Sequence, residues 1–163
     1  MKANKKSFLF TILMFISTAM FSQIAGNLDL GISTNSGKMS FIGASGTYLH
    51  DIDGGFSIGG NFGLRVMTTK GVSGVSIPIM ANVRYYVGGD NYGFYPEALI
   101  GFIHYRHTTT GIIKIKYRAT PFAFAFGAGY KTEQSIDISA RYEAISTSLG
   151  TAGLIGLRVG YWF

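Results

Sequence analysis

Apolar and polar side chains alternate with a period of two through most of the chain beyond residue 22, which is the pattern of β-strands with two different faces. In segment 136–144 every even position is apolar or small and every odd position is polar or charged. Segment 155–163 keeps apolar residues at its odd positions, and segment 122–130 alternates bulky residues with Ala or Gly. Helical periodicity is nearly absent, so we expect an all-β chain.

Five further segments have the composition or alternation of strands. They are 24–34, 39–49, 56–67, 75–87 and 94–106. The pattern of segment 39–49 leaves its facing open. Turn-forming residues rich in Gly, Asn and Asp separate the segments at the spacing of hairpins. Consecutive hairpins predict an eight-stranded antiparallel up-and-down meander.

The composition limits the chemistry that the chain can perform. Cysteine is absent, which excludes disulfides, thiolate metal sites and a cysteine nucleophile. Only 13% of the residues are charged, roughly half the usual fraction of about 25%, whereas 15% are aromatic. This profile fits a protein whose surroundings are partly not water.

The first residues have the features of an export signal. Three lysines lie in residues 1–6, and an uncharged run follows over 7–21. This run is shorter than the roughly 20 residues of a transmembrane helix, which favours a cleaved secretory signal peptide over an uncleaved anchor helix. We therefore expect a signal peptide over 1–22 and one domain over 23–163. Export also argues against a nucleic-acid partner.

The size of the side chains indicates which face of the sheet points outward. Eight strands enclose a lumen just wide enough for side chains, so the bulky aromatic face would overfill it. Placed outward in water, the same face would exceed any tolerated apolar patch. Lipid removes the difficulty, which favours an all-β, eight-stranded antiparallel up-and-down transmembrane β-barrel, a monomer, over a soluble lipocalin-like carrier.

Aromatic residues gather around the predicted turns at one end of the meander and at the C-terminus. Such a cluster is typical of an aromatic girdle at a membrane interface. The predicted girdle consists of Tyr48, Phe56, Tyr85, Tyr86, Tyr92, Phe94, Tyr95, Tyr130, Tyr161, Trp162 and Phe163.

Four stretches carry a resemblance to a known family. They are 136–142, 155–163, Ile77-Pro78-Ile79 with Arg84-Tyr85-Tyr86, and Gly93-Phe94-Tyr95-Pro96. Together they resemble the outer membrane protein β-barrel domain family of small eight-stranded bacterial barrels. The resemblance implies a place in the outer membrane of a Gram-negative cell envelope. It also implies that the barrel-assembly machinery reads the last strand through Ile155, Leu157, Val159, Tyr161 and Phe163.

Eight charged residues fall on the predicted lumen face. They are Asp29, Arg65, Arg84, Glu97, Asp137, Arg141, Glu143 and Arg158. Four acids and four arginines in so small a space must pair, because an unpaired buried charge costs several kcal/mol. We expect a salt-bridged network that fills the lumen, and the alternative is a narrow ion path.

A basic group surrounds the third predicted outer loop. It comprises His104, Arg106, His107, Lys114, Lys116 and Arg118. If strand parity persists past Pro121, the even-numbered members face outward just above the bilayer. Lipopolysaccharide phosphates lie at that height, and Lys or Arg can bind them. The alternative is an ordinary solvated loop.

No catalytic, cofactor or metal site is expected. Some small outer-membrane barrels are lipid A-modifying enzymes that use Ser and His at the rim, but His50, His104 and His107 have no Ser at a partnering spacing with an obvious acid. His104 and His107 also fall on opposite faces of a strand. We expect a non-catalytic barrel with a structural or surface-interaction role. Narrow transport of small solutes and a rim enzyme are the alternatives.

Overall fold

Nine β-strands make up almost all of the computed structural model, which describes residues 22–34, 39–69, 72–109, 116–147 and 150–163. The strands are β1 (Ser22–Ser33), β2 (Ser40–Asp51), β3 (Phe56–Thr69), β4 (Val72–Tyr85), β5 (Gly93–Thr109), β6 (Lys116–Ala119), β7 (Phe122–Lys131), β8 (Ile136–Thr147) and β9 (Gly150–Trp162). No helix in these ranges is long and apolar enough to cross a membrane.

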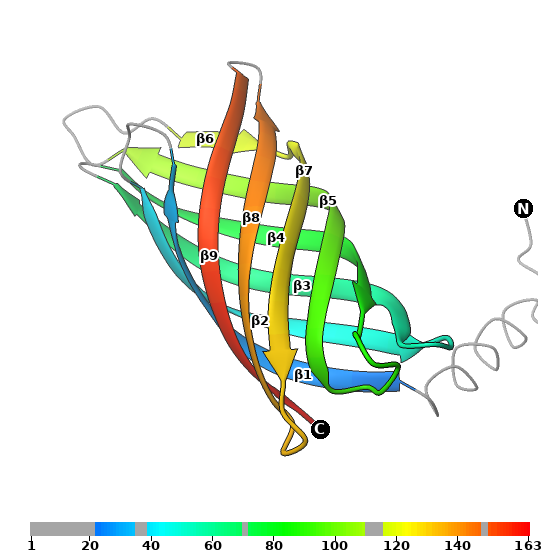
Figure 1. The fold of residues 1–163 in the computed structure, drawn as a ribbon. Coiled ribbons are helices and arrows are strands. Elements are labelled where there is room, and N and C mark those ends of the chain that lie inside the picture. Colours follow the sequence, from blue (N-terminus) through cyan, green and yellow to red (C-terminus); the bar gives the residue numbers. More distant parts are fainter. Residues whose placement is uncertain (1–21, 35–38, 70–71, 110–115, 148–149) are drawn as a thin grey trace, which may run out of the picture.

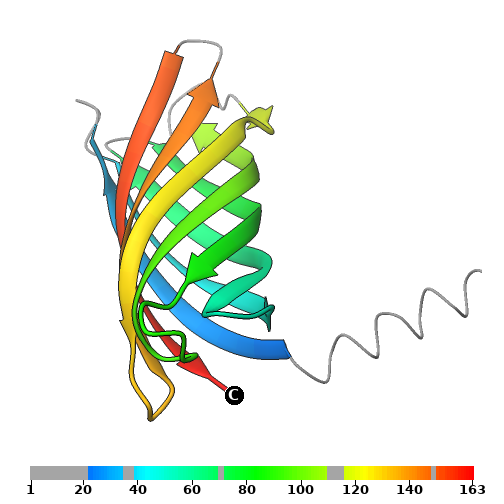
Figure 2. The ribbon, with the colours of Figure 1, turned by 45° about the vertical axis from the view of Figure 1, so that its right-hand side comes forward.

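The strands form one closed antiparallel barrel (Figures 1 and 2). Sequential neighbours pair except β6 and β7, β5 also pairs with β7, and the pairing of β1 with β9 completes the ring. β6 and β7 both pair with β5 in a single register, with Ala119 opposite Tyr105 and Phe122 opposite Phe102. They are therefore one wall strand with a short interruption, and the barrel has eight strands, as the sequence predicts.

Pro121 explains the interruption between β6 and β7. Proline has no N–H to donate to the ladder. Its carbonyl still accepts from the Ile103 N–H at 3.1 Å, so the register is kept across the break. The parity on which the outward placement of the basic group depended therefore persists.

The strands extend beyond the predicted segments chiefly at one end. β5 continues to Thr109 and β8 to Thr147, where the apolar alternation has faded into Thr and Ser. β6 was not predicted, because its four residues are too few to show a period. In β2, Ile42 and Tyr48 point outward while Phe41 points inward. Its facing was ambiguous because the inward face mixes apolar residues with Ser and Thr.

The two ends of the barrel differ in their connections. The β2–β3, β4–β5 and β7–β8 connections lie at the end where β1 starts and β9 finishes, which we call the turn end (Figure 1). Gly54 and Gly55, with φ of 58° and 83°, turn the chain there. The other four connections lie at the opposite end, which we call the loop end, and their central residues fall outside the described ranges, as do residues 1–21.

The outward surface of the barrel wall is apolar over its middle height. Leu30 and Leu157 lie opposite each other on β1 and β9 and are 53% and 60% exposed. The remaining outward positions of these strands are also mostly Ile, Leu, Val, Phe or Tyr. A water-facing surface of this kind is unfavourable, so the arrangement suits a hydrocarbon surrounding.

Part of the predicted aromatic girdle is wrong. Eight of its eleven members are exposed on the outward face or in the turns, but Tyr86, Tyr95 and Trp162 are buried inside the barrel. Each of the three is next in sequence to an outward aromatic residue. Because successive residues of a strand point to opposite faces, a pair of adjacent aromatics cannot lie wholly on one face.

The apolar surface predicts a height-dependent cost for charge. Leu157→Arg, at mid-height, should lower the free energy of unfolding by about 2–4 kcal/mol, whereas Ser40→Arg, outward on β2 at the loop end, should cost about 0–1 kcal/mol. Denaturant titration of the protein refolded into phosphatidylcholine vesicles measures both. Equal costs at the two heights would contradict a membrane around the middle of the wall.

Candidate functional site

All eight charged residues predicted for the lumen lie in the barrel interior and are buried. They project from β1, β3, β4, β5, β8 and β9, each from a position of inward parity. Among the described residues, five ion pairs connect these eight side chains. The four acids balance the four arginines.

Arg84 on β4 is the centre of the largest group. Its guanidinium donates to Asp137 at 2.8 Å and to Glu97 at 3.2 Å. Its Cζ lies 3.7 Å from the centroid of the Tyr95 ring and 5.3 Å from that of Trp162, which are cation–π distances. The planar guanidinium thus donates hydrogen bonds to two carboxylates from its edge and contacts aromatic rings with its faces. A lysine could not reproduce this arrangement.

Asp137 and Glu97 each serve more than one donor. Asp137 accepts from the Tyr95 hydroxyl at 2.5 Å and from the Trp162 indole N–H at 2.9 Å, in addition to Arg84. Glu97 accepts from Arg141 at 2.6 Å through its second oxygen. The carboxylates therefore join strands β4, β5, β8 and β9 across the interior.

The inward-facing aromatic Tyr95 depends on a glycine in the neighbouring strand. Gly129 lies opposite Tyr95 in the β5–β7 ladder. A Cβ at Gly129 would come within 2.4 Å of the Tyr95 hydroxyl. Because that hydroxyl is held by Asp137, the ring cannot move away without losing a charge-assisted hydrogen bond.

Asp29 and Arg158 form a second group, on β1 and β9. Arg158 Nε donates to Asp29 at 2.7 Å, and the Ser45 hydroxyl donates to the other carboxylate oxygen at 2.6 Å. Arg158 also reaches Asn61 at 3.3 Å. Polar residues of the lumen face that the sequence analysis did not single out complete this group. They are Asn27, Ser45, Thr47 and Asn61.

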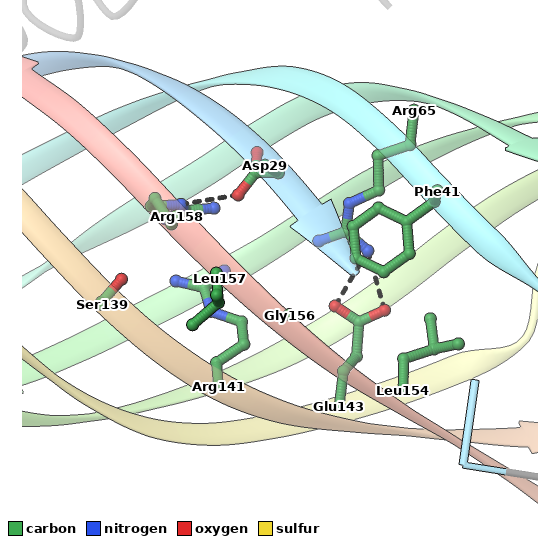
Figure 3. Close-up of a pocket in the computed structure, with 10 residues that line it drawn as sticks. All are labelled: Asp29, Phe41, Arg65, Ser139, Arg141, Glu143, Leu154, Gly156, Leu157 and Arg158. Carbon is green, nitrogen blue, oxygen red and sulfur yellow. Dashed lines mark hydrogen bonds and ion pairs between the residues drawn. The ribbon is translucent and has the colours of Figure 1, made fainter. Parts of the chain in front are cut away.

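Arg65 and Glu143 form the third group (Figure 3). The register of β3 and β8 puts them nearer the loop end than Arg84 and Asp137. One nitrogen of Arg65 donates to both carboxylate oxygens, at 2.9 and 3.0 Å. The Phe41 ring covers the guanidinium at 4.8 Å. The cavity among these residues and their neighbours Arg141 and Arg158 measures only about 10 Å³, which is room for about one water molecule.

The interior is closed above and below the charges. At the loop end lies an apolar cluster that includes Phe41, Ile103 and Leu154. At the turn end Trp162 packs with Ala25 and Leu49. A ninth buried charge, Lys131, also lies there with its ammonium 4.7 Å from the Trp162 ring and donates to Gln23. Its inward parity on β7 could have revealed it, but the predicted strand ends at residue 130, one residue earlier.

The basic group at the loop-end rim is only partly described. Arg106 lies opposite Arg118 on the outward face, and both are exposed, as is His104. Lys116 belongs to β6, and Lys114 lies outside the described residues. The outward positions from the loop end downward are thus an arginine pair, then His104 beside Thr120, then the exposed aromatic pair Phe102 and Phe122.

The three histidines are separated in the structure. His104 shares a hydrogen bond of 2.9 Å with Thr120 on the outward face. His107 faces inward and stacks on Tyr105, with ring centroids 5.6 Å apart. His50 lies near the turn end of β2. No cluster of three or more potential metal ligands occurs among the described residues.

The five residues of the proposed assembly signal alternate along the last strand. Ile155, Leu157, Val159 and Tyr161 of β9 all point outward and are about half exposed or more, and Phe163 follows at the C-terminus. They form an apolar outward stripe beside β1 and β8.

Comparison with known proteins identifies the fold. No protein-family model and no curated protein matches the chain. Among solved structures, the N-terminal β-barrel domain of Pseudomonas aeruginosa OprF matches with a TM-score of 0.67 and 14% identity, over 86% of this chain and 97% of that one. Ail, the attachment invasion locus protein of Yersinia pestis, matches with 0.66 and 16%, over 87% and 97%. The outer membrane enzyme PagL matches with 0.56 and 16%, over 84% and 98%.

These likenesses show the fold of the eight-stranded outer-membrane β-barrel proteins. The chain therefore resembles that class over nearly its whole described length, as the motifs in its sequence indicate. At identities this low, the likeness does not extend to what the neighbours do.

Because the interior charges are paired, removing one member of a pair should lower the free energy of unfolding more than removing both. Glu143→Gln leaves Arg65 without a counter-charge and should lower the free energy of unfolding by about 3–5 kcal/mol. Arg65→Met with Glu143→Met removes both charges while keeping volume, and should cost little or even stabilise. Denaturant unfolding in one detergent compares them. A double variant as unstable as the single one would contradict the pairing.

Proposed function

We propose that this protein is an outer-membrane β-barrel whose salt-bridged lumen is filled, with a structural or surface-interaction role in the cell envelope. The observation that carries the proposal is the packing of the interior. Five ion pairs occupy its middle, and the cavity beside Arg65 and Glu143 has room for about one water molecule. Apolar layers close it toward both ends.

The alternative of a narrow channel requires a continuous polar path. The apolar cluster at the loop end and the Trp162 cluster at the turn end both lie across any such path. Moving an ion past Arg84 would also disrupt the ion pairs of this arginine with two carboxylates and its cation–π contacts with two aromatic rings. Such a barrier favours a filled barrel over a pore.

A surface role is supported by the distribution of charge between the two ends. All eight acids of the chain lie either in the interior or at the turn end, the latter being Asp51, Asp53, Asp90 and Glu133. In the described part of the loop end, the charged residues are all basic and include Arg106 and Arg118, which lie opposite each other. In an outer membrane with the loop end outward, these cations would meet lipopolysaccharide phosphates.

Catalysis is the weaker alternative. The neighbour PagL is an enzyme, and a rim histidine, His104, does contact a hydroxyl here. However, no acid of this chain lies at the loop end to orient that histidine, and a hydrolytic Ser–His pair depends on such a group. We therefore assign no catalytic step.

A separate proposal concerns the last strand, β9. We propose that its outward apolar stripe serves recognition by the barrel-assembly machinery.

The filled lumen predicts a closed protein in planar bilayers. The unmodified barrel should show no steady openings, and neither Arg65→Ala nor Arg84→Ala alone should open it, because the two groups lie in series. Because the apolar clusters at both ends of the lumen remain, the combined variant should also stay closed. Leu157→Ala, on the outward face, serves as the control. Steady openings of the unmodified barrel would contradict the proposal and favour the channel.

The rim cations predict binding of lipid phosphate. Replacing Arg106 and Arg118 by Gln should weaken binding of lipopolysaccharide by about 2 kcal/mol, on the order of thirtyfold at low salt. The variant with Lys at both positions keeps the charge and should lose much less. Binding to dephosphorylated lipopolysaccharide should be weak for all three. An unchanged affinity in the Gln variant would contradict the proposed contact between the rim arginines and lipopolysaccharide.

A further inference from the structure

The wall of the barrel is notched at the loop end. The β7–β8 ladder begins at Ala123 opposite Ile145, and β8 ends only two residues later, at Thr147. β6 continues along β5 beyond that point. Within the described ranges no ladder joins β6 to β8 or β9. Among the described strands, β6 therefore has no neighbour on the side away from β5.

A cavity of about 430 Å³ lies behind this notch. Its apolar lining comes from Ala119 and Pro121 at the β6–β7 break, Tyr105 of β5, Ile145 of β8 and Ala152 of β9. The rest of the lining consists of Met39, His107, Thr120, Ser146 and Thr147. Tyr105 and Ile145 also belong to the buried apolar cluster of the interior, so the cavity continues that cluster toward the rim. The volume lies within the roughly 300–1,000 Å³ of ligand pockets, and the mainly apolar lining favours a hydrocarbon occupant.

The outward margin of the notch carries positive charge. Arg118 directly precedes Ala119, so its side chain leaves β6 on the outward face while Ala119 turns toward the cavity. Arg106 lies opposite Arg118. Below them the exposed rings of Phe102 and Phe122 lie edge to face, 5.9 Å between centroids. The opening thus lies where a cationic band meets an apolar surface.

We propose that this notch and cavity bind one anionic phospholipid, with one acyl chain inside the cavity and the phosphate outside on Arg106 and Arg118. This inference rests on the membrane location proposed above. The cavity is too small for more than part of a lipid, and it opens beside the surface on which lipid chains would pack. A free polar solute would gain little from Ala119, Pro121 and Ile145, whereas an acyl chain would find there the apolar packing contacts that it also has in the bilayer.

The test uses the full-length barrel in phosphatidylcholine vesicles that contain phosphatidylglycerol with a diazirine near the end of one acyl chain. After irradiation, mass spectrometry locates the attached label. We expect label on the cavity-lining residues Tyr105, His107 and Ile145, which we call the inward label, as well as on the outward surface. Ala119→Phe narrows the cavity beside β6 and should lower the inward label by about tenfold or more, because the added ring takes space that the acyl chain would occupy and overpacking is unfavourable.

Two controls separate the cavity from the general membrane surface. Ala44→Phe makes the same change on the outward face of β2 and should leave the inward label unchanged. Replacing Arg106 and Arg118 by Gln should reduce the inward label from phosphatidylglycerol to the level given by an identically labelled phosphatidylcholine.

The results distinguish failure of this site from failure of the membrane location. Label on the outward residues only, with none at the cavity, would overturn the lipid site while leaving the barrel in the membrane. Absence of label on the outward residues as well would overturn the membrane location itself. Equal inward labelling by the two lipids in the unmodified protein would overturn the role of the arginine pair.

Discussion

The neutralisation of Arg84 by Asp137 and Glu97 is the interaction on which the rest of the interior depends. An eight-stranded barrel has no space to hydrate a buried guanidinium, so its charge must be met by side chains from across the lumen. The two carboxylates in turn hold Tyr95, Trp162 and Arg141. Strands far apart in the sequence are thereby fixed in position by one connected group of charges.

The same constraint explains why glycine and small residues face some of the charged ones. The lumen can accommodate the arginines and aromatic rings only where the opposing strand contributes little volume, as Gly129 does beside Tyr95. The bulky apolar residues that a soluble protein would bury are displaced to the outside, where Leu30 and Leu157 lie. Filling the lumen with charge and covering the wall with hydrocarbon are therefore two consequences of one narrow cross-section.

The sequence was sufficient to predict the barrel, its strand number and the inward charges, because a period of two assigns each residue to a face without any knowledge of pairing. It could not predict which acid meets which arginine, since Arg65 and Glu143 are brought together by closure of the ring. Parity, applied strictly, would also have placed Tyr86, Tyr95 and Trp162 inside. Their aromatic character was given more weight than their position, and that produced the error in the girdle.

The notch could not have been found from the sequence, because it results from a difference in length between two hairpins. β6 continues the wall beside β5 past the end of β8, and only the closed register shows that no described strand pairs with Ala119 on that side. The interruption at Pro121 lies at this edge, where the wall changes from a full ladder to a single pairing. The charged interior below and the apolar cavity above thus divide the barrel into a sealed part and a part open toward the membrane surface.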